Sequence, residues 1–326
     1  MSIQSFDRNG ALAIKPGHLA PITVQEAGED LLRYSQEEHS RFGSGWSIDD
    51  SCGMVGAGEL ALWVARSGSG KSTAYLNIIR NTPDVPTVVV NMEMTARRQI
   101  EWLLSMTYDL QTPSRDIEEV LRIGEEDLRY GEVVTALDML GIRYPHLHFV
   151  TPVRPTIADL QFVLDDITDQ TGVRPVRMFA DHLGLMGGAE DYSGTIKAAS
   201  GLHSMAMRED LAVYVLQQTG RGDGAGGRND GHLPLTMTSG LYGGEADADW
   251  VLGMYRPERA PKYKKSRYQF DDPNDWYQMM EDRKLVEGIT ILQVLKNRPF
   301  GDLQEDGIEL RYDHHTRRLE ELGTYN

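Results

Sequence analysis

Apolar runs of strand length alternate with longer amphipathic stretches along most of the chain. Continuous apolar runs are typical of strands that are buried on both faces of a parallel sheet. We expect strands at 60–65, 87–91, 147–150, 176–181, 211–216, 250–255, 289–296 and 308–312. Helical stretches separate the first five strands, which predicts an α/β fold with a mostly parallel, twisted sheet and helices on both faces. The last two strands are expected to pair as late antiparallel strands.

The first forty or so residues stand outside this alternation. Residues 1–22 lack periodicity and predict an irregular arm, whereas residues 23–42 are helical and strongly acidic. Such a polar helix does not hold a core by itself, so it docks either on its own domain or on a neighbouring subunit. We therefore separate an N-terminal arm and linker helix at 1–42 from a main domain at 43–326.

Two segments of the main domain carry an excess of charge. Residues 114–140 are helical and strongly charged. Residues 257–287 lack clear periodicity and are predicted to form an irregular insertion, whose first half is basic. This basic half contacts DNA or forms a solvated surface excursion, and the pattern favours neither.

The composition is that of a globular domain with an acidic surface. The 326 residues are 40% hydrophobic and 25% charged, and the formal net charge is -16. This charge excludes a broadly basic surface, so contact with nucleic acid must be confined to a local patch or to a few loops. Cys52 is the single cysteine, which excludes an intrachain disulfide and a cysteine-based zinc site. Because no apolar run reaches the ~20 residues of a membrane span and no signal pattern opens the chain, we expect a cytoplasmic protein without a membrane partner.

The strand at 60–65 leads into a glycine-rich turn that opens a helix. This strand–loop–helix order is that of a phosphate-binding loop, in which backbone N–H groups and the helix N-terminus surround phosphate oxygens. Lys71 is expected to reach the β- and γ-phosphates of a nucleoside triphosphate, and Ser72 to hold Mg²⁺. The sequence departs from the usual pattern at its first glycine position, which is alanine. The predicted ATP-binding loop consists of Ala65, Arg66, Ser67, Gly68, Ser69, Gly70, Lys71, Ser72 and Thr73.

Three further polar residues lie at the ends of predicted strands, where ligands bind in open α/β sheets. Asp181 is placed to hold the Mg²⁺ shell, or else to cap a helix. Glu93 is placed to activate water for attack on the γ-phosphate, or else to be solvated. One of the adjacent Gln217 and Gln218 is placed to contact the γ-phosphate, because neighbouring strand residues point to opposite faces.

Two cations end a late strand. Lys296 and Arg298 precede a proline, and in oligomeric ATPases a cation in this place can reach the γ-phosphate of the neighbouring subunit as an arginine finger. The alternative is an exposed surface pair, and the pattern favours neither.

The order of these segments resembles the DnaB-type replicative helicases, which also carry alanine at the first glycine position. The resemblance runs from about Phe42 to about Leu319. The segments that carry it are Val64-Ala-Arg-Ser-Gly-Ser-Gly-Lys-Ser, Asn91-Met-Glu-Met, Asp181-His-Leu-Gly-Leu-Met, Gln218 followed by Arg221, Glu245-Ala-Asp-Ala-Asp and Leu295-Lys-Asn-Arg.

The resemblance implies a RecA-like ATPase domain at 43–326, a ring-shaped and usually hexameric homo-oligomer, and ATP hydrolysis with Mg²⁺ at subunit interfaces. It implies single-stranded DNA in a central channel, contacted by loops that contain Gly187, Gly188, Arg221 and Arg228. It makes Glu93 the catalytic base and Lys296 with Arg298 the trans-acting pair. It also favours Gln218 over Gln217, and a linker helix at 23–42 that packs on the next subunit.

This sequence departs from the family where few residues precede the core, so partners such as a primase or a loader are not carried over. The compact chain suggests a phage or plasmid origin. The leading hypothesis is an ATP-driven helicase motor on single-stranded DNA. The alternatives are a RecA-like recombination protein that coats single strands, and a P-loop ATPase directed at protein. Closed rings favour the motor, helical filaments favour the recombination protein, and absent DNA binding favours the third.

Overall fold

The structure is a computed structural model that describes residues 23–36, 41–219, 231–237, 243–265 and 272–322. Its contacts divide the chain into two units, Met1–Ser40 and Arg41–Asn326. The described element of the first unit is α1 (Val24–Gln36), on which Val24, Leu31 and Leu32 are exposed. Among the described helices, none combines the length and the apolar composition needed to cross a bilayer.

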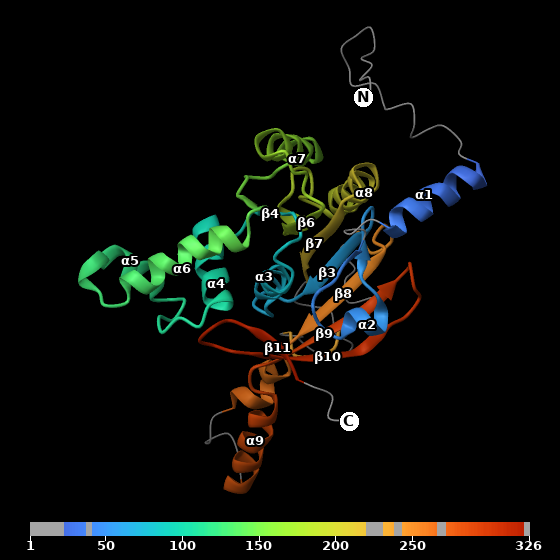
Figure 1. Cartoon of the computed structure of the whole chain (residues 1–326). Coiled ribbons are helices and arrows are strands. Elements are labelled where there is room, and N and C mark those ends of the chain that lie inside the picture. The colour runs from blue at the N-terminus through green and yellow to red at the C-terminus, as the bar shows by residue number, and fades with distance from the viewer. Residues whose placement is uncertain (1–22, 37–40, 220–230, 238–242, 266–271, 323–326) are drawn as a thin grey trace. The chain divides into compact units, whose positions relative to one another are not determined.

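A nine-stranded sheet organises the second unit (Figure 1). The strand order is β11-β10-β9-β8-β3-β7-β6-β4-β5. From β8 to β5 all neighbours are parallel, whereas β8, β9, β10 and β11 pair antiparallel in turn. The predicted α/β class with late antiparallel strands is confirmed. The bounds are β3 Leu60–Ala65, β4 Thr87–Asn91, β5 Leu147–Val150, β6 Arg177–Asp181, β7 Ala212–Gln218, β8 Trp250–Tyr255, β9 Ile289–Asn297, β10 Gln304–Tyr312 and β11 Leu319–Glu321.

Helices cover both faces of the sheet, and the alternation along β3 shows why. Ala61, Trp63 and Ala65 belong to one buried cluster with α3 and α4, whereas Leu60, Leu62 and Val64 belong to another with α7 and α8. Because successive strand side chains point to opposite faces, one continuous apolar run supplies both layers. The helices of the second unit are α2 Ile48–Cys52, α3 Lys71–Asn81, α4 Ala96–Thr107, α5 Ile117–Ile123, α6 Tyr130–Arg143, α7 Ile157–Thr171, α8 Tyr192–Glu209 and α9 Pro273–Val286.

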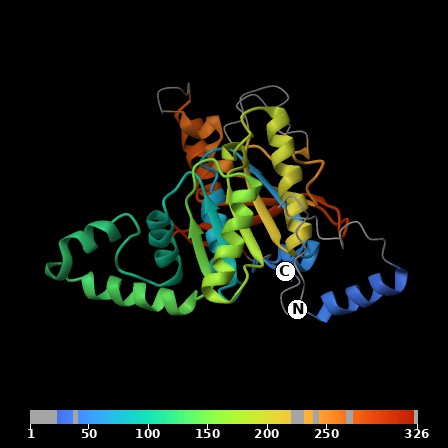
Figure 2. The same ribbon diagram turned by 90° about the horizontal axis from the view of Figure 1, so that it is seen from above.

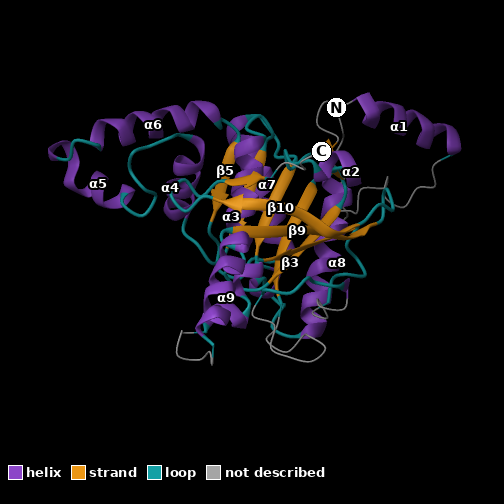
Figure 3. Ribbon diagram, turned by 90° about the horizontal axis from the view of Figure 1, so that it is seen from below, coloured by secondary structure: helices purple, strands orange, loops and turns teal. Residues whose placement is uncertain are grey.

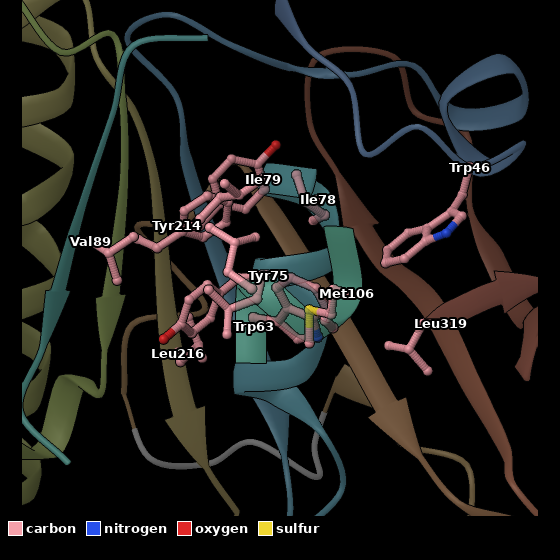
Figure 4. Close-up of a cluster of buried hydrophobic side chains, with 14 of the residues drawn as sticks. Trp46, Trp63, Tyr75, Ile78, Ile79, Val89, Met106, Tyr214, Leu216 and Leu319 are labelled. Carbon is pink, nitrogen blue, oxygen red and sulfur yellow. The ribbon is translucent and has the colours of Figure 1, made fainter. Parts of the chain in front are cut away.

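The cluster on the α3 face is rich in aromatic rings. Figure 4 shows Trp63, Tyr75 and Tyr214 close together between the sheet and α3. Phe179 of β6 lies between two of these rings, with centroids 5.3 Å from Tyr75 and 4.8 Å from Tyr214. Stacked pairs of this kind add to the burial of apolar area. These contacts fix the first turns of α3, which directly follow the phosphate loop, against the middle of the sheet.

The structure adds detail to the first of two predicted segments and differs from the second. Residues 114–140 form two helices, α5 and α6, because Gly124 adopts φ +78° and begins a 3-10 turn (Gly124–Glu126). The pair stands out beyond the β5 edge of the sheet, as Figures 2 and 3 show. The segment predicted to be irregular, 257–287, contains α9, which lacks an apolar face and therefore gave no periodicity. Its start is signalled by Asp272, whose side chain accepts from the N–H of Asn274.

A candidate nucleotide site at the carboxyl end of the sheet

The phosphate loop joins β3 to α3 at the centre of the sheet. β3 lies between β7 and β8 and ends at Ala65, and α3 begins at Lys71. The turn between them needs glycine, because Gly68 and Gly70 have φ of +73° and +100°. The predicted strand–loop–helix geometry is therefore present, with the first residues of α3 facing the end of the sheet.

Lys71 is buried against the loop that precedes it. Its Nζ donates to the carbonyl of Ala65 at 3.1 Å and to that of Arg66 at 3.5 Å. Burial lowers the pKa of Lys71 to about 8, although the carboxylates of Asp181 and Glu93 oppose this shift. A buried cation that rests on neutral carbonyls gains by contact with an anion, and a phosphate group is such an anion.

Ser72, in the first turn of α3, contacts Asp181, the last residue of β6. Oγ of Ser72 donates to Oδ2 of Asp181 at 2.7 Å. Burial raises the pKa of the Asp181 carboxyl, and the bond from Ser72 partly offsets that effect. A hydroxyl and a carboxylate oxygen are hard ligands of the kind that Mg²⁺ takes in phosphate sites, so this pair fits the predicted metal role.

Glu93 follows β4 and is held by two side chains, one at the end of β7 and one directly after β6. Nε2 of Gln218 donates to Oε1 of Glu93 at 3.0 Å, and Nε2 of His182 lies 3.3 Å from the same oxygen. Because Nδ1 of His182 accepts from the N–H of Gly184, its Nε2 carries the proton that it gives to Glu93. This bond holds the pKa of Glu93 below its usual value, so the carboxylate is ionised and can accept a hydrogen bond from a water molecule.

The two adjacent glutamines occupy opposite faces of β7. Gln217 is buried, while Gln218 is partly exposed and reaches Glu93. The structure thus places Gln218 among the predicted site residues and Gln217 away from them. His182 was not singled out from the sequence, although it lies directly after Asp181 in a quoted motif.

A cavity of about 250 Å³ opens beside the phosphate loop. One wall consists of loop residues together with Glu93 and Gln218, and the other carries aromatic and guanidinium groups that the sequence did not predict. The guanidinium of Arg317 lies 4.2 Å from the Trp102 ring centroid, and that of Arg256 lies 5.6 Å from the ring of Tyr312. Flat surfaces of this kind suit a planar base. The second wall consists of Trp102, Arg256, Thr290, Tyr312, Arg317 and Leu319.

Lys296 and Arg298 lie at the opposite end of the sheet. Asn297 pairs with Trp250 at the start of β8, whereas Ala65 pairs with Met254 near its end. Four strand residues separate these points, about 13 Å along the strand. The two cations therefore stand apart from the cavity of their own chain.

The surroundings of the two cations differ. Nζ of Lys296 donates to three carbonyls of the preceding turn, those of Glu245, Ala246 and Ala248, at 2.7, 3.3 and 2.6 Å. Arg298 pairs with Asp249 at 3.0 Å, and half of its side chain is exposed. Nη2 of Arg298 also donates to the carbonyl of Ala246 at 3.0 Å. Both cations therefore bind their own chain, but Arg298 also reaches the surface.

The predicted DNA loops begin at neighbouring strands. Gly187 and Gly188 lie between the 3-10 turn Leu183–Leu185, which follows β6, and α8. A Cβ at Gly187 would lie 2.9 Å from the carbonyl of Arg154, so this loop packs closely on its neighbour. Arg221 and Arg228 lie outside the described residues. Because β6 and β7 are adjacent and parallel, the loops that follow them start side by side.

The strand order and the two helical layers are those of an α/β core of the RecA-like type. No protein-family model and no curated protein matches the chain. Among solved structures, it is similar to one described as an ATPase domain, with a TM-score of 0.69 and 16% identity over 93% of this chain and all of that one. It is also similar to a DnaB-like replicative helicase whose structure describes interactions with primase, with a TM-score of 0.66 and 16% identity over 93% of this chain and 68% of that one. At this identity the likeness establishes the fold, and the predicted RecA-like core is confirmed.

Proposed function

We propose that this protein is an ATP-hydrolysing motor of the DnaB-like helicase type that acts on single-stranded DNA. The observation that carries the proposal is that Lys71, Ser72 and Glu93 line one cavity at the carboxyl end of the sheet. Ser72 is bonded there to a buried aspartate, and Glu93 is held by a glutamine. These are the parts that a phosphoryl-transfer site needs for binding phosphate, holding metal and orienting water.

Each group has a distinct part in the proposed reaction. Lys71 binds the phosphates and exchanges its carbonyl partners for charged oxygens. Ser72 and Asp181 would hold Mg²⁺, which would neutralise phosphate charge when bound. Glu93 accepts the proton of the attacking water, while Gln218 and His182 keep its carboxylate in place.

The second wall of the cavity binds the base. Tyr312 and Trp102 offer ring faces, and Arg317 lies against the Trp102 ring. Stacking on rings and guanidinium planes is tolerant of base identity. The proposal therefore includes binding of nucleoside triphosphates beyond ATP.

Hydrolysis requires a second copy of the chain in this proposal. Arg298 lies far from its own cavity and reaches the surface, which supports a role at the site of a neighbour. Lys296 supports it by fixing the turn that carries Asp249, the partner of Arg298. A ring in which every subunit meets its neighbour in the same way completes all sites at once.

The loops after β6 and β7 are the proposed contacts to DNA. They start beside the residues that hold Glu93, because His182 opens one loop and Gln218 ends the strand before the other. A change at the γ-phosphate therefore acts on both loops through short links. Electron microscopy on single-stranded DNA distinguishes the proposed rings from the filaments of a recombination protein.

The first test is ATP turnover with and without single-stranded DNA. We expect DNA to stimulate turnover in the wild type, and Lys71→Ala to lower it by at least about 100-fold, the scale of losing one preorganised charge partner. The variant should keep its melting temperature, because burial already disfavours the charge of this lysine. Lys284→Ala, at an exposed lysine of α9, is the matched control and should be unchanged.

Two results would contradict the proposal. Turnover in Lys71→Ala at the wild-type level would remove the phosphate site from the mechanism. A wild type that binds no labelled single-stranded DNA at low salt would favour an ATPase directed at protein, because phosphate contacts weaken steeply as salt rises and are strongest at low salt.

A further inference from the structure

The turn that follows β8 reaches back to the phosphate loop. β8 is followed by the 3-10 turn η5 (Pro257–Arg259). Nη1 of Arg259 donates to the carbonyl of Ser67 at 2.9 Å and lies 3.4 Å from Oγ of Ser69. A residue of the predicted insertion is therefore part of the phosphate-loop structure, although it lies outside every motif in the sequence.

The bond to Ser67 sets the direction of the next N–H group. In a trans peptide the carbonyl and the following N–H lie in one plane and point in opposite directions. With the Ser67 carbonyl turned to Arg259, the N–H of Gly68 faces away from Arg259, and Gly68 lines the nucleotide cavity. Backbone N–H groups are the ligands of phosphate oxygens in such loops. Arg259 thus orients a group that the loop uses for binding.

The same guanidinium lies against Gly231, the first described residue after the β7 loop. A Cβ at Gly231 would lie 2.9 Å from Oγ of Ser69 and 3.2 Å from Nη1 of Arg259. The N–H of Arg256 donates to the carbonyl of Gly231 at 2.8 Å. The phosphate loop, residue 231 and η5 therefore pack without room for a side chain. In close packing of this kind, a shift of one segment must be met by the others.

η5 is tied in turn to the strands and to α9. Glu258 pairs with Arg256 and accepts from the N–H of Gly288 at 2.7 Å. The guanidinium of Arg256 lies over Tyr312, which lines the nucleotide cavity. α9 contacts both η5 and the next turn, η6 (Pro261–Lys264). A continuous set of contacts thus leads from the phosphate loop to α9.

We propose that Arg259 is a positioning residue of the phosphate loop and that it couples nucleotide binding to η5 and α9. Its guanidinium holds the loop with its N–H groups directed at the phosphates. When phosphates tighten the loop, the bond to Ser67 passes the change to η5. The inference rests on the proposed nucleotide site and assigns to the 257–287 segment a part in reporting its occupancy.

Binding of a fluorescent ATP analogue with Mg²⁺ to the full chain tests the positioning part. Arg259→Ala should weaken binding about tenfold, the scale of one charge-assisted hydrogen bond in a partly exposed place. Arg259→Lys should recover part of this loss, because an ammonium can also donate to the Ser67 carbonyl. Arg283→Ala is the matched control and should stay within about twofold, since Arg283 lines the same surface hollow as Arg259 and its removal changes the local charge equally.

Hydrogen exchange with and without the analogue tests the coupling. In the wild type, nucleotide should slow amide exchange in residues 257–264, and Arg259→Ala should lose this response at saturating nucleotide. Equal binding by Arg259→Ala and wild type, an equal loss in Arg283→Ala, or a wild type without the exchange response would each overturn the inference. The wild-type exchange measurement decides even where Arg259→Ala does not fold. A wild type that binds no analogue would instead overturn the nucleotide site itself.

Discussion

The two ends of the central sheet hold their polar side chains differently. At the carboxyl end, groups from α3 and from the ends of three strands face one another within one chain, and Glu93 contacts both Gln218 and His182. At the amino end, Arg298 and Lys296 bind the turn before β8, and Arg298 reaches the surface. The first arrangement gathers the groups of the proposed reaction site, and the second leaves one cation half exposed at the surface.

This difference separates what one chain completes from what it offers to another. Parallel strands bring their carboxyl ends to the same end of the sheet. Polar residues that follow these strands in the sequence therefore lie close together within one chain. The antiparallel β9 runs the other way, and its last residues lie at the opposite end of the sheet. The reversal of strand direction after β8 therefore places Arg298, the proposed finger residue, at the end of the sheet opposite the proposed nucleotide site.

Mixing two inactive variants gives the largest expected effect. Arg298→Ala should lower turnover about 1,000-fold, as loss of an arginine finger does, and Lys71→Ala should be similarly inactive. In an equal mixture, an interface with Lys71 from one subunit and Arg298 from the next forms in about a quarter of cases. Turnover of the co-assembled mixture should rise toward that fraction of wild type.

Exchange of subunits must be verified by labelled copies in the same mixture. A mixture that exchanges subunits yet stays inactive would place Arg298 in the site of its own chain or outside catalysis. The proposed division between a site at the carboxyl end of the sheet and a trans-acting cation at the amino end would then be wrong. Arg115→Ala, at a largely exposed arginine, serves as the control for loss of one guanidinium.

The residues at the carboxyl end of the sheet were predictable from the sequence because short sequence patterns specify them. A strand, a glycine turn and a helix start lie within 60–73, and Glu93, Asp181 and Gln218 each end an apolar run. Parallel order then brings these ends together without further information. The sequence pattern therefore predicted both the fold class and one wall of the cavity.

The other wall was not predictable, since its residues gain meaning only through distant contacts. Tyr312 and Arg317 lie in and after β10, and reach the cavity because β10 and β11 pair beyond β9. Arg259 lies in a segment without periodicity, and its partner Ser67 is far away in the sequence. No local pattern predicts pairs of this kind.

A smaller effect should distinguish the two amino-edge cations. Lys296→Met removes three hydrogen bonds from a charged donor to the 245–248 carbonyls and should lower the free energy of unfolding by about 2 kcal/mol. Arg298→Ala should cost less, because half of its side chain is exposed and exposed ion pairs contribute little. Thermal unfolding of both variants checks the order. A melting temperature lower in Arg298→Ala than in Lys296→Met would reverse the assignment of supporting and acting residue.

Arg177 also lies at the amino end of the sheet, but it is fully buried at the start of β6 and cannot reach a neighbouring subunit. Its guanidinium donates to Oγ1 of Thr87 at 3.1 Å and of Thr82 at 2.9 Å, and its Nη2 has no partner among the described residues. Burial lowers the pKa of Arg177 to about 10. Both hydroxyls already donate to nearby carbonyls, so they lose little if the arginine is removed.

Arg177→Met should therefore give the smallest change, with a free energy of unfolding within about 1 kcal/mol of wild type or slightly above it, because an apolar chain of similar length replaces a buried, incompletely paired charge. Arg177→Ala is the matched control and should cost about 2–5 kcal/mol, since it leaves a cavity beside Phe179. Chemical denaturation of both variants separates packing from charge. A methionine variant as unstable as the alanine variant would show that the charge itself is needed at this edge. In that case we would assign the need for the charge to the C-terminus of α3, where Thr82 follows the last helical residue. A cation there is attracted by the negative end of the helix dipole.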